Sequence, residues 1–194
     1  MNHKKKKFQV YHLLVSEGTT EYNLFGYLKN RFKDLFDDSN IKFSDKVQIP
    51  SAGISNGKLN GASHIKSFRS KYQLIKEQYK DQKRFFILDK DLDDSKKIAD
   101  AIKKGKDVVQ FIEYNSEYLL LNFAGKNPKK PSDFKNLKIF RNYCKTEFKA
   151  QFGKEASAFK DQDFGKILNK VDDEEMKKVF SELFNLIALA NIKK

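Results

Sequence analysis

The sequence lacks the residues that disulfide or zinc frameworks need. It has a single cysteine, Cys144, so no internal disulfide can form, and a reducing compartment such as the cytoplasm is expected. Its three histidines, His3, His12 and His64, are scattered, which argues against a histidine-rich zinc site. No apolar run approaches the ~20 residues of a membrane helix, and the short run near the N-terminus is too brief for a signal-peptide core. We therefore expect a cytoplasmic protein that does not enter the membrane.

Tryptophan is also absent, and hydrophobic residues make up only 39% of the 194 residues. This share is low for a globular protein. The 18 phenylalanines and 8 tyrosines compensate for it, so we expect a core rich in aromatic rings. The length fits one domain, or one domain with a small appendage.

The net charge of +13 is the most informative number in the composition. A basic surface attracts phosphate backbones, and such binding depends on salt. DNA or RNA, tRNA included, is therefore the expected partner. Two alternatives stay open at this stage: an acidic protein partner, and lysines that only keep helix surfaces soluble.

Apolar runs bounded by turn signals predict four buried strands. They are expected at residues 8–15, at 47–50 with a start as early as 41, at 84–89 and at 107–114. Helical spacing predicts a helix capped by Thr19 or Thr20 that runs to about residue 36, and helices at about 65–79, 95–105 and 115–123. The glycine-rich segment 51–63 is expected to be a flexible loop.

The alternation of strands and helices predicts an α/β fold, a four-stranded, mostly parallel sheet with helices on both faces. Further apolar stripes predict helices at about 137–148, 164–171 and 172–187. We therefore divide the chain into a basic arm (1–7), an α/β domain (8–123) and a helical C-terminal extension (124–194).

Two of the predicted strands end abruptly in acid. Glu17 follows the first strand, and Glu21 comes four residues later; Asp89 and Asp91 follow the third strand. In parallel sheets, ligands bind beyond the carboxyl ends of the strands. If the strand continues through Asp89 and Asp91, both side chains point the same way, roughly 7 Å apart at about 3.3 Å per residue. Such oxygen ligands suit Mg²⁺ or Mn²⁺, which serve phosphodiester chemistry.

Each acidic segment also has a purely structural interpretation. The segment DKDLDD (89–94) can be an acidic turn that caps the following helix. The segment EGTTE (17–21) can be a helix N-terminus whose acids complement the helix dipole. The occurrence of both after buried strands in a basic chain favours a shared site.

The stretch EGTTEYNLFGYL after a strand, followed about 70 residues later by an apolar run and DxD, resembles a Toprim domain. It is most similar to the branch formed by OLD-type nucleases and RloB-like proteins, and the later YNSEYLLLNF resembles a further RloB-like segment. The resemblance covers residues 8 to about 123. It implies a metal-dependent nuclease that acts in anti-phage defence or abortive infection, beside an ABC-type ATPase.

The resemblance also implies roles for single residues. Glu17 corresponds to the Toprim glutamate, a metal ligand or general acid/base, and Asp89 and Asp91 correspond to the DxD metal ligands. Glu21 is similar to the second acid of the OLD type. In a two-metal site, with ions about 4 Å apart, Glu21 and Glu117 supply the additional ligands.

Four further residues have alternative interpretations. Glu117 can equally be a first-turn helix acid, and Asp93 is either a weaker metal ligand or part of a helix cap. Lys58 in the glycine-rich loop and Lys166 are candidates for binding phosphate or nucleic acid, or are ordinary solvated lysines.

Two other functions stay open. The chain can be a non-catalytic subunit that binds nucleic acid or docks a partner, with structural Mg²⁺ or none. A phosphoryl-transfer enzyme of the response-regulator or phosphatase type needs a lysine after a later strand, and the fourth strand ends in Tyr114, Asn115 and Ser116 instead. The lysine-rich C-terminal third can also form an oligomer interface.

Overall fold

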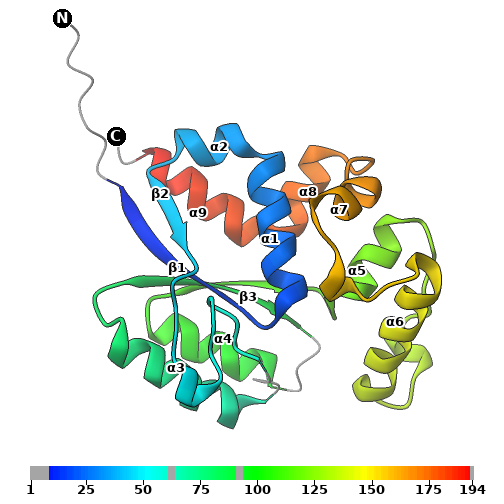
Figure 1. Ribbon diagram of the computed structural model, residues 1–194, viewed down its shortest axis with the longest axis horizontal. Helices are drawn as coiled ribbons and strands as arrows, with labels where there is room; N and C mark the ends of the chain where they lie inside the picture. Colours follow the sequence, from blue (N-terminus) through cyan, green and yellow to red (C-terminus); the bar gives the residue numbers. More distant parts are fainter. Residues whose placement is uncertain (1–8, 61–63, 91–93, 193–194) are drawn as a thin grey trace, which may run out of the picture.

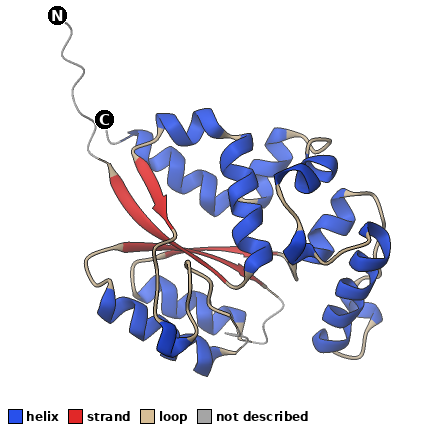
Figure 2. Ribbon diagram, viewed as in Figure 1, coloured by secondary structure: helices blue, strands red, loops and turns tan. Residues whose placement is uncertain are grey.

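A computed structural model describes residues 9–60, 64–90 and 94–192 of the chain. Four strands form one parallel sheet: β1 (Val10–Ser16), β2 (Ile41–Ser44), β3 (Lys83–Asp89) and β4 (Val108–Ile112). Their order in the sheet is β2-β1-β3-β4. The predicted α/β class, with a parallel four-stranded sheet and a helical C-terminal region, is confirmed (Figure 2).

The helices follow the strands in the expected alternation. Their bounds are α1 (Thr19–Arg31), α2 (Lys33–Asp38), α3 (Ile65–Gln78), α4 (Ser95–Lys104), α5 (Ser116–Phe123), α6 (Leu137–Phe152), α7 (Asp161–Leu168), α8 (Asp173–Val179) and α9 (Ser181–Ile192). Short 3₁₀ turns lie at η1 (Pro50–Ala52), η2 (Pro131–Asp133) and η3 (Ala156–Ala158). Helices α3 and α4 cover one face of the sheet, and α1, α2 and α9 cover the other (Figure 1).

Alternate residues of each strand supply the two cores. In β3, Phe85 and Ile87 point into the core beneath α1, whereas Phe86 and Leu88 point into the core beneath α3 and α4. All four are buried, with exposed fractions of 1% or less. A strand buried on both faces reads as a continuous apolar run, which is why this strand is clear in the sequence.

The second strand lies earlier than the main expectation of 47–50. Residues Ile41–Ser44 pair with β1, whereas Val47 and Ile49 hydrogen-bond to the glycine-rich segment: Gly57 N–H donates to Val47 O (3.1 Å) and Ile49 N–H to Ile54 O (2.9 Å). The expectation that this segment is a flexible loop is wrong for residues 51–60. Ile54 and Leu59 in it are fully buried, because they complete the core beneath α3.

Two predicted helices are each divided in two. The first breaks at Phe32, whose ring is buried against Phe184 (centroids 4.8 Å apart). The last breaks at Phe180. There the buried side chain of Gln110 in β4 accepts the Glu182 N–H (3.0 Å), which caps the start of α9.

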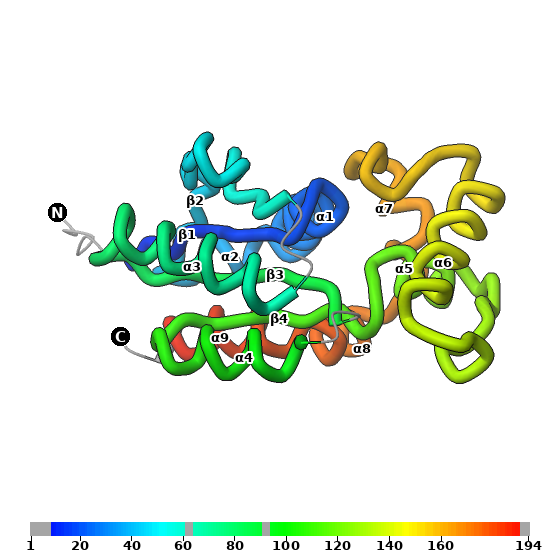
Figure 3. The backbone as a smooth tube through the Cα atoms, turned by 90° about the horizontal axis from the view of Figure 1, so that it is seen from below, coloured from blue at the N-terminus to red at the C-terminus, as the bar shows by residue number. Residues whose placement is uncertain are grey.

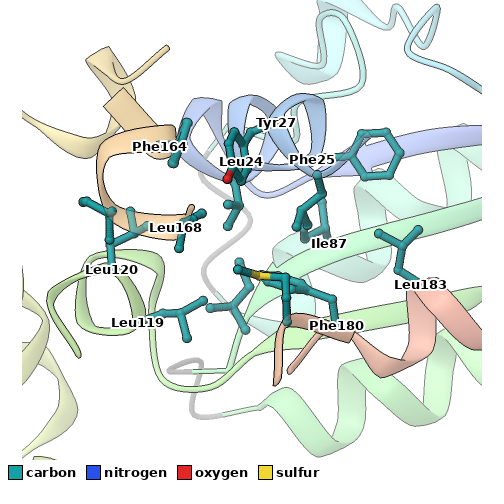
Figure 4. Close-up of a cluster of buried hydrophobic side chains, with 14 of the residues drawn as sticks. Leu24, Phe25, Tyr27, Ile87, Leu119, Leu120, Phe164, Leu168, Phe180 and Leu183 are labelled. Carbon is teal, nitrogen blue, oxygen red and sulfur yellow. The ribbon is translucent and has the colours of Figure 1, made fainter. Parts of the chain in front are cut away.

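The C-terminal helices share a core with the sheet. Phe164 and Leu168 of α7 lie in one cluster with Leu24 of α1 and Ile87 of β3 (Figure 4). The Arg31 guanidinium adds a polar tie from α1, donating to Val171 O at 2.6 Å. Helices α5, α6 and α7 gather beyond the carboxyl ends of the strands (Figure 3), so the extension borders the edge where the acids were expected.

Candidate functional site

The site lies at the point where the strand order of the sheet reverses. From β1 the chain crosses to β2 on one side, and β3 lies on the other side of β1. Ligands of open parallel sheets bind at such a switch point. Glu17 directly follows β1: its backbone N–H donates to Ile87 O (3.1 Å), and its Oε2 accepts the Asp89 N–H (3.2 Å). The acids that end β1 and β3 are therefore neighbours.

Glu21 is held at the start of α1, close to both. The helix is capped by Gly18 rather than by Thr19 or Thr20. As the third helical residue, Glu21 reaches back so that its Oε2 accepts the Gly18 N–H (2.8 Å). Its side chain is buried, with an exposed fraction of 5%. The short turn of EGTTE therefore places a carboxylate inside the protein, next to the strand ends.

Ser116, the first residue of α5, joins the two sides of the site. Its Oγ lies 2.8 Å from Glu21 Oε1 and 3.0 Å from Asp89 Oδ1. A hydroxyl carries one proton, so Ser116 can donate to only one of two ionised carboxylates. Burial raises the pKa of Glu21 above its ordinary value, while the Ser116 and Gly18 hydrogen bonds and the nearby Lys145 act in the opposite direction.

These side chains surround a cavity of about 260 Å³. It is lined by Glu17, Gly18, Thr19, Thr20, Glu21, Asn60, Asp89, Glu117 and Lys145. Glu117, in the first turn of α5, and Lys145, on α6, enter from the helical side. Asn60 enters from the glycine-rich segment, where its N–H donates to Glu17 O (3.1 Å).

A second cavity of about 330 Å³ adjoins the acidic one and shares Thr20, Glu117 and Lys145 with it. Its other lining residues include Lys149 one turn further along α6, together with hydroxyl side chains. Glu155 lines it too, and the Lys149 Nζ lies 3.6 Å from the Glu155 Oε1, so in this cleft two lysines of α6 stand against Glu117 and Glu155.

The structure brings together four of the predicted site residues: Glu17, Glu21, Asp89 and Glu117. Asp91 and Asp93 lie outside the described residues. Strand β3 ends at Asp89.

The donor set has the chemistry that Mg²⁺ or Mn²⁺ requires, because all four residues supply carboxylate oxygens. Two of them, Glu21 and Asp89, compete for one hydroxyl proton, an arrangement that a cation would relieve. Within the described ranges, however, no three His, Cys, Asp or Glu side chains converge as the ligands of a bound metal ion would.

The two candidate lysines lie elsewhere. The Nζ of Lys58 is 5.1 Å from the ring centroid of Tyr22, and Lys58 does not line the acidic cavity. Lys166, on α7, lines two other cavities.

Sequence reasoning missed Ser116, Asn60 and Lys145 as site residues. The sequence pattern gave Ser116 no role in the site, although it stands beside Glu117 in the segment NSE. Asn60 belongs to a segment that was expected to be flexible. Lys145 had no signal, because nothing distinguishes it among 39 lysines and arginines.

No protein-family model matches the chain, and neither a curated protein nor a solved structure matches it. Of the described helices, none is long and apolar enough to cross a membrane. The fold and the site thus define the class on their own: an α/β protein with an acidic, lysine-bordered site at the switch point of a parallel sheet.

Proposed function

We propose that this protein is a nuclease of the Toprim type that uses Mg²⁺ or Mn²⁺ to hydrolyse phosphodiester bonds in DNA or RNA. One observation carries the proposal: acids from β1, α1, β3 and α5 line a single cavity at the carboxyl edge of a parallel sheet. The chain around that cavity has a net charge of +13, which suits a polyanionic substrate.

The acids of the site have the following proposed roles. Glu17, Asp89 and Glu117 would hold the cation with their carboxylates, joined by Asp91, whose role rests on the sequence pattern alone. Glu17 would also act as general acid or base. When bound, the cation would stabilise charge on the phosphate and lower the pKa of a water molecule. Ser116 orients Glu21 and Asp89 through its hydroxyl.

Two lysines of α6 that line the cleft support a polyanionic substrate. Lys145 lines both the acidic cavity and the adjoining one, and Lys149 follows on the same face of α6. Phosphates on either side of the cleaved bond would contact these two lysines and the hydroxyls of Thr146 and Ser157, which line the same cleft.

The test is cleavage of plasmid DNA and of tRNA with Mg²⁺ or Mn²⁺. Asp89→Asn and Glu17→Gln keep the size of each side chain and remove its charge. We expect each to lower the cleavage rate by at least about 100-fold, since even the indirect partners of metal ligands contribute 10- to 100-fold. The matched control is Asp100→Asn, an exposed acid on α4, which should leave the rate unchanged. Cleavage that survives both site variants would rule out this assignment.

One observation favours a second candidate, a non-catalytic domain that binds nucleic acid or docks a partner. The Ser116 hydroxyl lies between Glu21 and Asp89, so the acids have a protein partner without any cation. Salt-dependent binding of DNA or RNA without cleavage of either, at saturating Mn²⁺, would support this candidate over the nuclease.

The proposal extends to the biological role of the protein. EGTTEYNLFGYL and the later Asn-Ser-Glu segment resemble OLD-type and RloB-like proteins. This resemblance supports an effector in anti-phage defence that acts in the cytoplasm beside an ABC-type ATPase. Plaque formation by phage on cells that express the wild type or Asp89→Asn, with and without a co-expressed ABC-type ATPase, tests it.

A further inference from the structure

A further cavity, of about 370 Å³, lies among α5, α6 and α7. We call it the cavity beside α7. It shares no lining residue with the acidic cavity or with the adjoining cleft. Its lining residues are Phe123, Ala124, Lys126, Phe152, Lys154, Phe159, Asp163, Lys166, Ile167 and Lys170. Three aromatic rings and four lysines therefore surround one space, and a ligand would have to match both.

The aromatic part of the cavity is built into the core. Phe159 is buried, with its ring centroid 5.7 Å from that of Phe152 at an angle of 82°. Phe123 and Phe152 pack on the same core but stay only half-buried, so part of each side chain remains exposed on the cavity side. Planar apolar groups stack well on such rings.

The charged part of the cavity is strongly positive. Lys154 is paired with Asp163 (2.7 Å) and lies over the Phe159 ring. Lys126, Lys166 and Lys170 are exposed, and among the described residues none of them forms an ion pair. With four lysines and one aspartate, the lining carries three net positive charges.

The excess of positive charge is not found in every cavity of the described structure. The larger cavity between α1 and β2, about 480 Å³, is also lined by phenylalanines. Its charges balance, however, because Lys29 and Lys160 stand against Asp45 and Asp161. Of these two cavities, the one beside α7 has the excess of cations.

We propose that the cavity beside α7 binds a nucleotide, with the base against Phe123 and Phe152 and the phosphates on Lys126, Lys166 and Lys170. A nucleotide joins a flat ring to several negative charges, which is the combination that the lining matches. The nucleotide is either free or one unit of a single strand. The proposal does not depend on the acidic site, since no residue is common to the two.

Calorimetric titration of the full chain with ADP and with inorganic pyrophosphate tests the proposal. ADP should bind at least about fivefold more tightly than pyrophosphate, because stacking of one base contributes about 1–3 kcal/mol. Phe123→Leu keeps an apolar side chain and removes the ring. It should weaken ADP by at least about fivefold and leave pyrophosphate within about twofold. Phe152→Leu repeats this test if Phe123→Leu lowers the thermal stability.

The double variant Lys166→Gln with Lys170→Gln should weaken both ligands. The matched control is Lys103→Gln with Lys104→Gln, two exposed lysines on α4 at the opposite face of the sheet, which should change neither. A pentanucleotide that binds more tightly than ADP and responds to the same variants identifies a strand as the source, and the reverse order identifies a free nucleotide. The proposal is overturned if ADP binds no better than pyrophosphate, or if the control weakens binding as much as the double variant.

Discussion

At the level of single residues, Ser116 determines how the acids of the site face one another. Glu21 and Asp89 come from α1 and β3, and the Ser116 hydroxyl from α5 lies within hydrogen-bond distance of both. The hydroxyl supplies one proton, so it donates to one of the two carboxylates at a time, while the Gly18 N–H donates to the other oxygen of Glu21 (2.8 Å).

His12 gives a residue-level prediction about acid stability. It is buried in β1, and burial together with the charge of Lys83 lowers its pKa from 6.5 to about 4. The folded protein therefore keeps His12 neutral while the unfolded chain protonates it. The resulting stability is present above pH 6.5 and is lost as the pH falls toward 4. At pH 5 this loss amounts to about 2 kcal/mol relative to pH 7.

Urea unfolding at pH 7 and pH 5 measures this loss. The variant His12→Leu cannot be protonated, so its stability should fall less between the two pH values than that of the wild type. Equal losses in both proteins would mean that His12 is charged in the folded state.

At the level of elements, the sequence predicted correctly the helices and strands whose residue pattern fits only one type of element. The predicted helix at about 65–79 and the predicted strand at 84–89 match α3 (Ile65–Gln78) and β3 (Lys83–Asp89) to within one residue. The second strand was ambiguous, because residues 41–44 and 47–50 are both short and both alternate apolar with other side chains. Only the tertiary structure distinguishes them: the first pairs with β1, and the second pairs with the glycine-rich segment.

The glycine-rich segment is tied to the end of β1, and Gly57 makes this approach feasible. Ser16 N–H donates to Gly57 O (2.8 Å), and Leu59 N–H donates to Ser16 O (2.9 Å). Gly57 has φ +71°, and a Cβ there would lie 2.2 Å from Leu14 O. Gly57→Ala should therefore destabilise the protein by more than about 2 kcal/mol, since strain and a clash add together.

Gly53→Ala is a matched control within the same segment. Gly53 has φ +66°, but no atom lies within 4 Å of a Cβ built there, so only the strain of about 1–2 kcal/mol remains. The difference between the two variants in urea unfolding isolates the close contact with β1. If Gly57→Ala is no worse than Gly53→Ala, the segment can move away from the strand.

At the level of the whole molecule, the sequence predicted which acids lie together in the site better than it predicted which lysines do. Glu17, Glu21, Asp89 and Glu117 each stand next to a recognisable strand end or helix start, so sheet topology alone brings them together. The position of a lysine such as Lys145 depends on how α6 packs against α5 and η3, which no local pattern records. For the same reason the expected phosphate ligand Lys166 lines the cavity beside α7 instead.

The distribution of lysines leads to a prediction about salt dependence. If the cleft beside the acids holds a nucleic-acid backbone, Lys145 and Lys149 each displace counterions from one phosphate. Lys145→Gln with Lys149→Gln should then lower the slope of log Kd against log salt by about 2 for duplex DNA, or slightly less for a single strand. The pair Lys103→Gln and Lys104→Gln removes the same charge from the opposite face of the sheet. The slopes are measured by fluorescence anisotropy. An equal loss of slope in both double variants would mean that nucleic acid binds through the net charge of the protein rather than in the cleft.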